Sequence, residues 1–266
     1  MKFTKMQGLG NDYLYFHEEV PANVSKLSIL LSDRHYGIGS DGLIYITASA
    51  TADFGMRIFN ADGSEALMCG NGIRCVGKYI YEKGLSKKTD LQIETKSGIR
   101  QLHLHIRNGK ADSVSVNMGK VTVSDPKEIV IHGQAYTLYP VNTGNPHAVI
   151  FTDEAGLTLP EKIGALIEHH PLFPDGVNCE FVRVCDDGKL RMRVWERGSG
   201  VTMACGTGAT ASAAAAVFTG AVPSDMPVSV ELDGGILELR KEDNGEFWMR
   251  GPAEFVYEAE IEMEGV

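Results

Sequence analysis

The chain contains an internal repeat, and this repeat constrains the fold more than any other feature of the sequence. Residues 55–72, GMRIFNADGSEALMCGNG, align without a gap with residues 191–208, RMRVWERGSGVTMACGTG. The alignment places Cys69 opposite Cys205, and Gly-x-Gly follows each cysteine. Upstream, GNDYLYF from Gly10 matches GNPHAVIF from Gly144, and between these landmarks SDGLI (40–44) is aligned with PDGVN (174–178). Because three landmarks recur in one order at similar spacing, the sequence predicts two homologous halves.

Each half has the pattern of an α+β domain. Runs rich in β-branched and aromatic residues predict strands at 12–16, 43–47, 56–60, 91–95, 101–106 and 113–117, and then at 148–151, 179–184, 190–195, 228–232 and 236–240. Each half shows one helix pattern, directly after its cysteine, at 72–83 and at 208–219. We therefore expect two pseudo-symmetric domains, 1–116 and 117–250, each a curved, mostly antiparallel sheet wrapped around a central helix.

The C-terminal segment has a separate pattern. Residues 256–265 read VYEAEIEMEG, in which glutamate alternates with other residues. This alternation predicts a strand with one face turned inward and the other in water. The inward set would be Tyr257, Ala259, Ile261 and Met263.

Composition and charge exclude several classes of protein. The sequence is 43% hydrophobic and 23% charged, which is ordinary for a globular protein. A net charge of −10 without a basic block argues against nucleic acid as a partner. The longest apolar stretch, 211–222, is too short to span a bilayer, and the N-terminus lacks the pattern of a signal peptide. The five cysteines are an odd number without a short paired framework, so we expect free thiols and a cytoplasmic location.

Cys69 and Cys205 both stand where a helix is predicted to begin. A helix N-terminus has unpaired N–H groups and a partial positive charge, so it stabilises a thiolate and lowers the pKa of a thiol. Glycines beside the thiol expose further N–H groups to an anion such as a carboxylate. A single cysteine is more often an inert buried residue, but two at equivalent helix starts indicate a reactive pair. The other three, Cys75, Cys179 and Cys185, are assigned to packing.

Two equivalent thiols suggest a particular reaction. If the helix starts of the two halves face one cleft, a bound substrate has a thiol on each side. One thiolate can remove a proton from a carbon atom while the opposite thiol returns a proton to the other face, which inverts the stereocentre. We also expect that Cys69 and Cys205 can form a disulfide when no substrate lies between them.

Polar residues recur at equivalent places in the two halves. They are Asn11 and Asn145, which each follow a glycine, and Asn60 and Glu196, which end matching strands, with Arg197 next to Glu196. Asn and Arg side chains suit a small zwitterion with several carboxylates and ammonium groups. His147 lies two residues after Asn145 and is a candidate for tuning a thiol.

We expect neither a cofactor nor a metal. GIGSDG at 37–42 fits the glycine pattern of a dinucleotide site, but no strand precedes it and no helix follows it. The spacings C-x-x-C and H-E-x-x-H of zinc sites do not occur, and His103 and His105 have no clear third ligand.

With these residues assembled, the chain closely resembles the diaminopimelate epimerase family, nearly from end to end. The resemblance rests on GLGNDY, DRHYGIGSDGL, NADGSEALMCGNGIRC, GNPHAV, VWERGSG and ACGTGA. It implies interconversion of LL- and meso-2,6-diaminopimelate, for lysine and peptidoglycan synthesis, without pyridoxal phosphate or metal. It also implies a homodimer with Tyr257 near the interface, and a C-terminal strand, residues 251–266, that returns to the first domain.

The resemblance further implies a role for each site residue. Cys69 and Cys205 would be the base and the acid, exchanging roles with the direction of the reaction. The backbone N–H groups of Gly70-Asn71 and Gly206-Thr207 would bind the carboxylate at the reacting carbon and stabilise the charge that develops there. The distal carboxylate would be held by Asn60, Asn178 and Arg197, the remaining binding groups would be Asn11, Asn145 and the Glu196 backbone, and His147 and Glu196 would tune the thiols.

Two positions depart from the family pattern. Gly42 stands where many members have glutamine, and Val201 stands where the family usually has glutamate. In the repeat alignment Val201 faces Glu65, so the acid is lost from the second half only. A carboxylate at 201 would be expected to raise the pKa of Cys205 or to hydrogen-bond the loop. Its loss keeps open an alternative activity, a cofactor-independent racemase of another amino acid such as histidine. A third interpretation, a non-catalytic protein that binds small anions, is opposed by the presence of both thiols.

Overall fold

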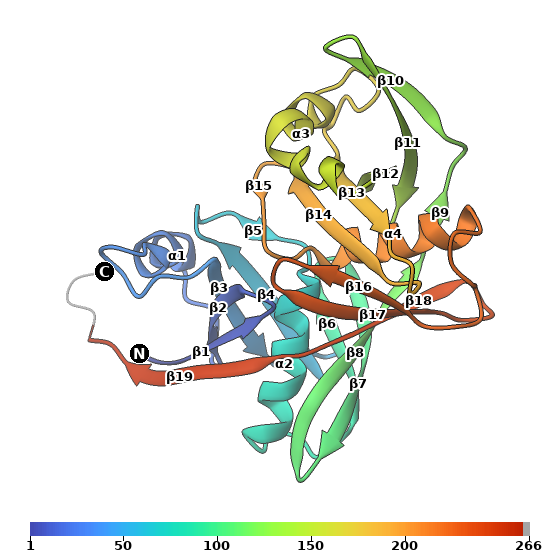
Figure 1. The fold of residues 1–266 in the computed structure, drawn as a ribbon. Helices are drawn as coiled ribbons and strands as arrows, with labels where there is room; N and C mark the ends of the chain where they lie inside the picture. Colours follow the sequence, from blue (N-terminus) through green and yellow to red (C-terminus); the bar gives the residue numbers. More distant parts are fainter. Residues whose placement is uncertain (263–266) are drawn as a thin grey trace. The chain divides into compact units, whose positions relative to one another are not determined.

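In both halves of the chain, the strand and helix patterns of the sequence form a sheet that packs around a buried helix (Figure 1). The computed structural model describes residues 1–262. The chain divides into two compact units. The first comprises Met1–Val116 and the segment from Gly251 onward, and the second comprises Asn117–Arg250.

The elements follow the same sequence in the two units. The first unit contains β1 (Lys2–Gly8), β2 (Asn11–Phe16), α1 (Val24–Ser32), β3 (Gly42–Thr47), β4 (Phe54–Asn60), β5 (Glu65–Ala66), α2 (Gly70–Glu82), β6 (Asp90–Thr95), β7 (Gly98–Arg107), β8 (Lys110–Lys120), which continues past Val116, and β19 (Glu254–Glu260). The second contains β9 (Thr122–Val123), β10 (Lys127–Ile131), β11 (Gln134–Asn142), β12 (Pro146–Phe151), the 3-10 helix η1 (Ala155–Thr158), α3 (Pro160–Glu168), β13 (Asn178–Val184), β14 (Leu190–Glu196), β15 (Gly200–Val201), α4 (Gly206–Phe218), β16 (Val228–Leu232), β17 (Gly235–Lys241) and β18 (Glu246–Gly251).

The sheets are mostly antiparallel, which confirms the predicted fold class. In the first unit β2–β3 and β4–β6 are parallel, and in the second unit the corresponding pairs β12–β13 and β14–β16 are parallel. A parallel pair needs a crossover connection, and a helix supplies it in each case. These crossovers contain α1 and α2 in the first unit and α3 and α4 in the second.

The sequence marks both the start and the end of the central helices α2 and α4. Cys69 and Cys205 are their N-cap residues, so each helix begins two residues earlier than predicted. Gly84 and Gly220 follow the C-terminal ends with φ of +76° and +72°, the left-handed conformation that terminates helices. Ten of the thirteen residues of α4 are buried, and they are alanine, glycine, serine or threonine. These small side chains allow the strands of the second unit to approach the helix closely.

The expectation of one helix in each half is wrong, because α1 and α3 are also present. They stand at equivalent places: 136 positions separate Val24 from Pro160, as they separate Gly70 from Gly206. Both helices have only nine residues and no side-chain cap, so their sequence signal is weak. Each contributes apolar side chains to a core of its own unit. Leu27 and Leu31 pack with Phe16 and Tyr45 in the first unit, and Ile163 and Ile167 pack with Phe181 in the second.

Strand pairing corrects the alignment of the middle landmark. Ile44 lies opposite Ile58, and Glu180 lies opposite Val194. Since Ile58 and Val194 are repeat partners, Ile44 corresponds to Glu180, and Gly42 corresponds to Asn178. The alignment of SDGLI with PDGVN was therefore two residues out of register.

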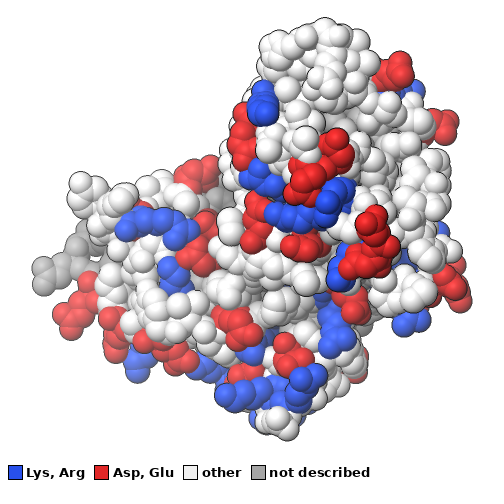
Figure 2. Space-filling model, viewed as in Figure 1, with Lys and Arg blue, Asp and Glu red and all other residues white. Residues whose placement is uncertain are grey.

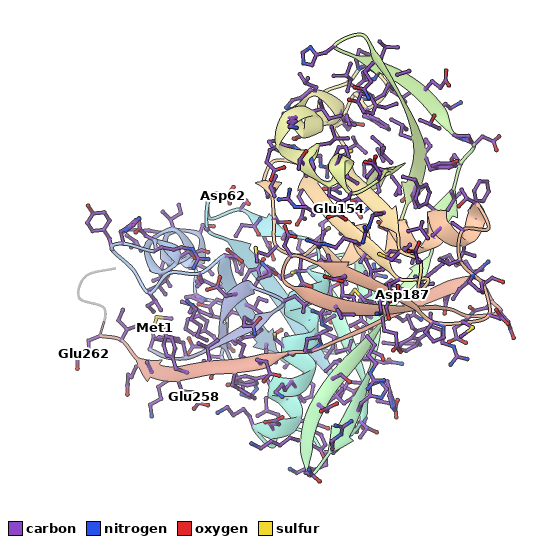
Figure 3. The ribbon with its side chains drawn as sticks, viewed as in Figure 1. Met1, Asp62, Glu154, Asp187, Glu258 and Glu262 are labelled. Atoms are coloured by element: carbon purple, nitrogen blue, oxygen red, sulfur yellow. The ribbon has the colours of Figure 1, made fainter. Side chains whose placement is uncertain are left out.

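The C-terminal strand β19 pairs antiparallel with β1 (Figure 1). The predicted inward face is wrong for two of its residues, because Tyr257 is 42% exposed and Ala259 is also exposed. Ile261 is half-buried, and its carbonyl accepts a hydrogen bond from the amino group of Met1 at 2.8 Å, at the end of the ribbon where Figure 3 labels Met1. Met263 lies outside the described residues.

The surface carries charges of both signs. In the view of Figure 2, basic and acidic side chains are interspersed. Among the helices of residues 1–262, none has the length and apolar character needed to cross a membrane.

Candidate active site

Cys69 occupies the start of α2 in an extended conformation, with φ −135° and ψ 116°. Its Sγ accepts a hydrogen bond from the N–H of Gly72 at 3.3 Å, so the sulfur is the N-cap group of the helix. The first N–H groups of a helix point outward from its N-terminal end, and here they belong to Gly70 and Asn71. A half-exposed thiol therefore lies beside N–H groups that can bind an anion.

Asn11 contacts this thiol from β2. The Cys69 Sγ donates to Asn11 Oδ1 at 3.3 Å, and the Asn11 amide nitrogen donates to Asp41 Oδ2 at 2.7 Å. Asp41 thus determines which end of the amide faces the sulfur. Arg34 in turn donates a hydrogen bond to Asp41 at 2.9 Å. Asp41 belongs to the segment GIGSDG, which resembled a dinucleotide motif, and this segment therefore anchors Asn11.

Asn60 and Asn71 have different surroundings. Asn60 ends β4, and its amide nitrogen donates to Ser64 Oγ at 3.0 Å. Asn71 is 3% exposed and accepts a hydrogen bond from Arg74 Nη1 at 3.1 Å through its side-chain oxygen. Arg74, which the sequence analysis did not single out, is fully buried directly beneath the first turn of α2.

Cys205 occupies the start of α4 in the same conformation, with φ −120° and ψ 113°. Its Sγ accepts from the N–H of Gly208 at 3.3 Å and lies 3.4 Å from the Thr207 hydroxyl. The helix starts at Gly206 and Gly70 are therefore equivalent in cap geometry as well as in sequence. Cys205 differs from Cys69 in being 5% exposed.

The charge around Cys205 reverses one sequence prediction. We expected the helix start to lower the pKa of this thiol. Instead burial, followed by the carboxylates of Glu196 and Glu180, raises the pKa of Cys205 well above its ordinary value. Burial also raises the pKa of Glu196, which hydrogen-bonds Cys205 and accepts from the Thr202 hydroxyl. Cys205 is thus held in its protonated form.

His147 and Glu180 form a buried pair beside this thiol. His147 Nδ1 lies 2.7 Å from Glu180 Oε1, and both side chains are 0% exposed. The other ring nitrogen of His147 lies 3.2 Å from Asn145 Oδ1. A Cβ atom at Gly208 would lie 2.7 Å from Glu180 Oε1, which shows how closely this carboxylate approaches the start of α4. Asn145 and His147 are therefore linked to the surroundings of Cys205 through Glu180.

Asn178 and Arg197 are neighbours at the ends of β13 and β14. The side-chain oxygen of Asn178 accepts from the backbone N–H of Arg197 at 2.9 Å, and its amide nitrogen donates to the Pro146 carbonyl at 3.3 Å. Asn178 is buried, whereas Arg197 is exposed and donates to the Asp175 carbonyl. In the first unit Gly42 stands where Asn178 stands, and a Cβ atom there would meet the Phe59 carbonyl at 2.1 Å with φ at +155°. A side chain at position 42 would therefore require this backbone to take another conformation.

Val201 lies on β15 opposite Trp195, as Glu65 lies on β5 opposite Phe59. Glu65 pairs with Arg57 at 2.7 Å and with Lys96 at 2.9 Å. Arg193, the repeat partner of Arg57, is paired instead with Glu161 and Asp233. Glu161 and Asp233 therefore supply Arg193 with the negative charge that a glutamate at position 201 would give it. The carboxylates of Glu196 and Glu180 beside Cys205 are present as well.

Three residues of this site were missed from the sequence: Asp41, Arg74 and Glu180. Asp41 and Arg74 lie inside the quoted motifs DRHYGIGSDGL and CGNGIRC, so their presence there was a signal. Glu180 became visible only when strand pairing corrected the register. Among residues 1–262, no group of three or more His, Cys, Asp and Glu side chains is arranged to hold a metal ion.

Comparison with known proteins agrees with these features. The family model for diaminopimelate epimerase matches residues 3–124 and 139–256. Proteins named diaminopimelate epimerase from Acetivibrio thermocellus and Phocaeicola vulgatus are 47% and 48% identical to the chain, and each comparison covers 99% of both sequences.

Solved structures share the fold at much lower identity. A probable proline racemase from Agrobacterium radiobacter aligns with a TM-score of 0.73 at 17% identity, over 99% of this chain and 93% of its own. A phenazine biosynthesis protein of the PhzF family from Bacillus anthracis also aligns with a TM-score of 0.73, at 15% identity and 99% coverage of both chains. The full-length match at nearly half identity, together with the two cysteine-capped helices, shows that the chain belongs to the diaminopimelate epimerase family.

Proposed function

We propose that this protein interconverts LL- and meso-2,6-diaminopimelate without pyridoxal phosphate or a metal, as an isomerase of lysine and peptidoglycan synthesis. The observation that carries the proposal is the pair of helices α2 and α4, each capped by a cysteine sulfur at a repeat-equivalent position. The family supplies the substrate, a small zwitterionic dicarboxylate amino acid.

Cys69 and Cys205 are proposed as the acid/base pair. In one direction the Cys69 thiolate takes the α-proton, and the Cys205 thiol gives its proton to the opposite face of the same carbon. The negative charge then rests on Cys205, and the reverse reaction exchanges the roles. Near Cys205, the carboxylates of Glu196 and Glu180 favour the protonated thiol, and His147 holds Glu180 in place.

The binding residues are proposed by the same reasoning. Gly70, Asn71, Gly206 and Thr207 provide the helix-start N–H groups for the carboxylate at the reacting carbon. Asn60, Asn178 and Arg197 bind the distal carboxylate, and Asn11, Asn145 and the Glu196 backbone complete the set. The hydrogen bond from the Arg197 backbone N–H to Asn178 Oδ1 supports this assignment, because it joins two of the residues that are proposed to bind one carboxylate.

Proton exchange with solvent tests the mechanism. With LL-diaminopimelate in deuterated water, under reducing conditions, we expect deuterium at one carbon of the meso product. Cys69→Ser and Cys205→Ser should each slow inversion by about 10²- to 10⁴-fold. Cys179→Ser, at a buried cysteine outside the site, should keep the wild-type rates of exchange and inversion. Pure enzyme that neither exchanges nor inverts the substrate would refute the proposal.

The comparisons do not favour the alternative, a racemase of another amino acid such as histidine. A panel of amino acids followed by chiral chromatography separates the two activities. We expect turnover of diaminopimelate alone, and faster turnover of histidine would reverse the assignment.

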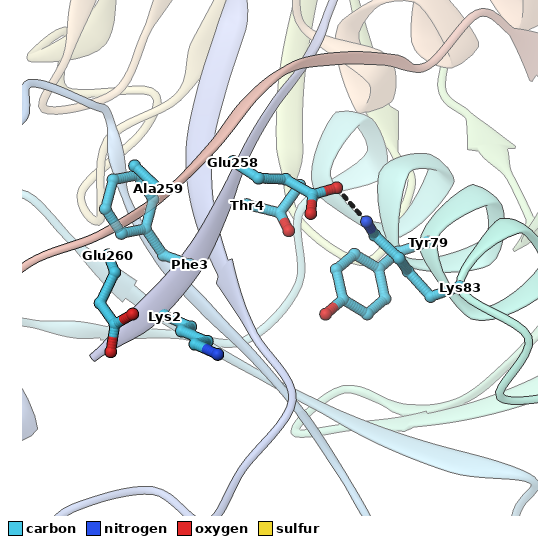
Figure 4. Close-up of a pocket in the computed structure, with 8 residues that line it drawn as sticks. All are labelled: Lys2, Phe3, Thr4, Tyr79, Lys83, Glu258, Ala259 and Glu260. Carbon is cyan, nitrogen blue, oxygen red and sulfur yellow. Dashed lines mark hydrogen bonds and ion pairs between the residues drawn. The ribbon is translucent and has the colours of Figure 1, made fainter.

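We also propose a homodimer that uses the surface of β1, β19 and α2. Val256 and Tyr257 on β19 are 52% and 42% exposed. Figure 4 shows a pocket beside this strand, lined by Lys2, Phe3, Thr4, Tyr79, Lys83, Glu258, Ala259 and Glu260. A two-fold interface needs a self-complementary surface, and this one combines apolar groups with lysines and glutamates.

Sedimentation measures the assembly. The wild type should have twice the mass of one chain, and Val256→Glu should reduce it to one. Ile236→Glu, at an equally exposed position on β17 in the second unit, is the matched control. A monomeric wild type at micromolar concentration would contradict the dimer.

The thiols also bear on location. All five cysteines are free in this structure, and the proposed chemistry needs Cys69 and Cys205 reduced, so we propose a cytoplasmic location. We further propose that oxidant joins Cys69 and Cys205 reversibly in the absence of substrate. Activity should fall on mild oxidation and return with reductant, and activity indifferent to both would count against the disulfide.

A further inference from the structure

The two homologous halves differ in charge at two repeat positions next to the thiols. Where the first half has Ile44, the second has Glu180, and where the first has Arg74, the second has Thr210. The positions are structurally equivalent. Ile44 Cδ1 would lie 2.6 Å from a Cβ atom at Gly72, as Glu180 Oε1 would lie 2.7 Å from one at Gly208. Arg74 and Thr210 both donate to the first carbonyl of their helix, at 3.2 and 2.8 Å. One thiol therefore has a buried cation nearby and the other has buried carboxylates.

Arg74 is an unusual buried charge. Its side chain is 0% exposed, and Nη2 has no hydrogen-bond partner among the described residues. Its other nitrogens donate to neutral oxygens: the Pro252 carbonyl at 3.1 Å, the Gly70 carbonyl at 3.2 Å and Asn71 Oδ1 at 3.1 Å. In the described part of the chain, no carboxylate lies within ion-pair distance of it. A guanidinium stays protonated in proteins, and a buried charge without a counter-ion is costly, so a nearby anion would be stabilised strongly.

Cys69 is the group that can provide this anion. Burial lowers the pKa of Arg74, and electrostatic interactions with Cys75, then Cys69 and then Tyr15 oppose this shift. Burial raises the pKa of Cys75 to about 11 and that of Tyr15 well above its usual range, so both stay neutral at physiological pH. Cys69 is less buried and stands at a helix start, where a thiolate is favoured. Among the described residues, Tyr13, whose pKa burial also raises, interacts electrostatically with Cys69, and Asp41 lies behind Asn11.

Arg74 also holds the anion-binding loop. Its bond to the Gly70 carbonyl fixes the plane of the peptide that joins Gly70 to Asn71, and thereby the direction of the Asn71 N–H. Its bond to Asn71 Oδ1 fixes the side-chain amide of the same residue. The Arg74 guanidinium therefore orients both the Gly70–Asn71 peptide group, next to Cys69, and the side chain of Asn71.

We propose that Arg74 is a positioning residue that makes Cys69, rather than Cys205, the thiol that gives up its proton first in the ligand-free protein. At the other helix start, Glu196 hydrogen-bonds the Cys205 thiol and Glu180 adds a second carboxylate, so that proton is retained. The catalytic meaning of the inference rests on the function proposed above. The isomer whose α-hydrogen faces Cys69 reacts directly with the ligand-free form, and each turnover leaves Cys69 protonated and Cys205 ionised. The proton must move back before the same isomer can react again.

The test measures thiol reactivity without any substrate. Iodoacetamide alkylation of the Cys69 and Cys205 peptides is followed by mass spectrometry between pH 5 and 10, in wild type, Arg74→Gln and Arg74→Lys. Lys78→Gln is the matched control, because Lys78 is a second buried cation on α2, bonded to the Ala111 carbonyl at 2.7 Å. Each rate profile yields the midpoint at which that thiol ionises.

In the wild type the Cys69 midpoint should lie below that of Cys205. Arg74→Gln should raise the Cys69 midpoint by about one pH unit, which is about tenfold slower alkylation at pH 7. Arg74→Lys should restore the wild-type profile, and Lys78→Gln should leave it unchanged.

A Cys69 midpoint that Arg74→Gln does not move, or that Lys78→Gln moves equally, would overturn the proposal. Should Arg74→Gln fail to fold, the wild-type profile still decides, because ionisation of Cys69 at or after Cys205 contradicts it. The result is independent of turnover. A protein inactive on diaminopimelate that still shows the Arg74 effect would refute the proposed function and leave this inference standing.

Discussion

Replacing Cys205 by serine or by alanine separates the proposed role of its sulfur in proton transfer from its role as a helix cap. The Sγ accepts the Gly208 N–H at 3.3 Å, so the side chain closes the first turn of α4. Serine keeps an acceptor at this place but lacks an acidic thiol. Alanine removes both.

The expected losses follow from the geometry. Removing an N-cap acceptor costs about 1 kcal/mol of unfolding free energy. Cys205 is 5% exposed, so in Cys205→Ala the loss of the buried sulfur adds about 1 kcal/mol to this loss of unfolding free energy. Serine keeps a cap acceptor, so the unfolding free energy of Cys205→Ser should stay within about 0.5 kcal/mol of the wild type. Cys69 is half-exposed, so Cys69→Ala should cost only about 1 kcal/mol. Epimerisation should fall about 10²- to 10⁴-fold in Cys205→Ser, Cys205→Ala and Cys69→Ala, because each variant lacks one member of the proposed acid/base pair.

Urea unfolding curves and the deuterium exchange assay measure the two effects separately. Cys179 is the control for stability: it is buried in β13 and caps no helix, so serine there should be less stable than alanine. Equal stability of the serine and alanine variants at 205 would show that the sulfur is not a cap. A serine variant as active as the wild type would show that proton transfer does not need the thiol.

Three further changes test other parts of the structure. Burial raises the pKa of Cys75 to about 11, so the folded protein keeps this proton longer than the unfolded chain, and about 3 kcal/mol of stability is lost as pH rises from about 9 to 11. In urea titrations across this range Cys75→Ala should lose correspondingly less, and parallel curves for the two proteins would contradict the raised pKa. Gly208→Ala should lower the unfolding free energy by about 1–3 kcal/mol and remove most of the activity, since its Cβ must displace Glu180 Oε1 at 2.7 Å. An unchanged rate of epimerisation would show that the reaction does not need this carboxylate at its observed position. Val201→Glu should change kcat/KM on diaminopimelate by less than about fivefold, because position 201 is partly exposed and Arg193 already has two acids; a larger gain would make Val201 the limit on the reaction.

The repeat and the two central helices could be predicted because their signals are local. A cysteine followed by Gly-x-Gly and an apolar run marks the start of α2 and α4, and a glycine marks each end. The helices α1 and α3 were missed, since nine residues without a side-chain cap have little signal of their own and are stabilised by packing on their sheets.

The charge difference between the halves could not be predicted, because it depends on strand register. Aligning Asn178 with Ile44 hid the match between Ile44 and Glu180, and only the pairing of β13 with β14 revealed it. The pKa of Cys205 was misjudged for a related reason. A helix start favours a thiolate locally, but Glu180 and Glu196 reach it from distant strands. Val201 shows the converse, since the lost acid was offset at Arg193 by residues far away in the sequence.

The pairing of β1 with β19 has a consequence for synthesis on the ribosome. β19 is made after the other strands of the first unit, so this unit lacks the partner of β1 until residues 254–260 have emerged. Pro252, whose carbonyl accepts a hydrogen bond from Arg74 Nε, is also made at this late stage. The second unit lies entirely within Asn117–Arg250 and contains all of its own strands by then. Vectorial synthesis therefore completes the Cys205 half before the Cys69 half, and the surroundings of Cys69 are complete only after β19 has emerged.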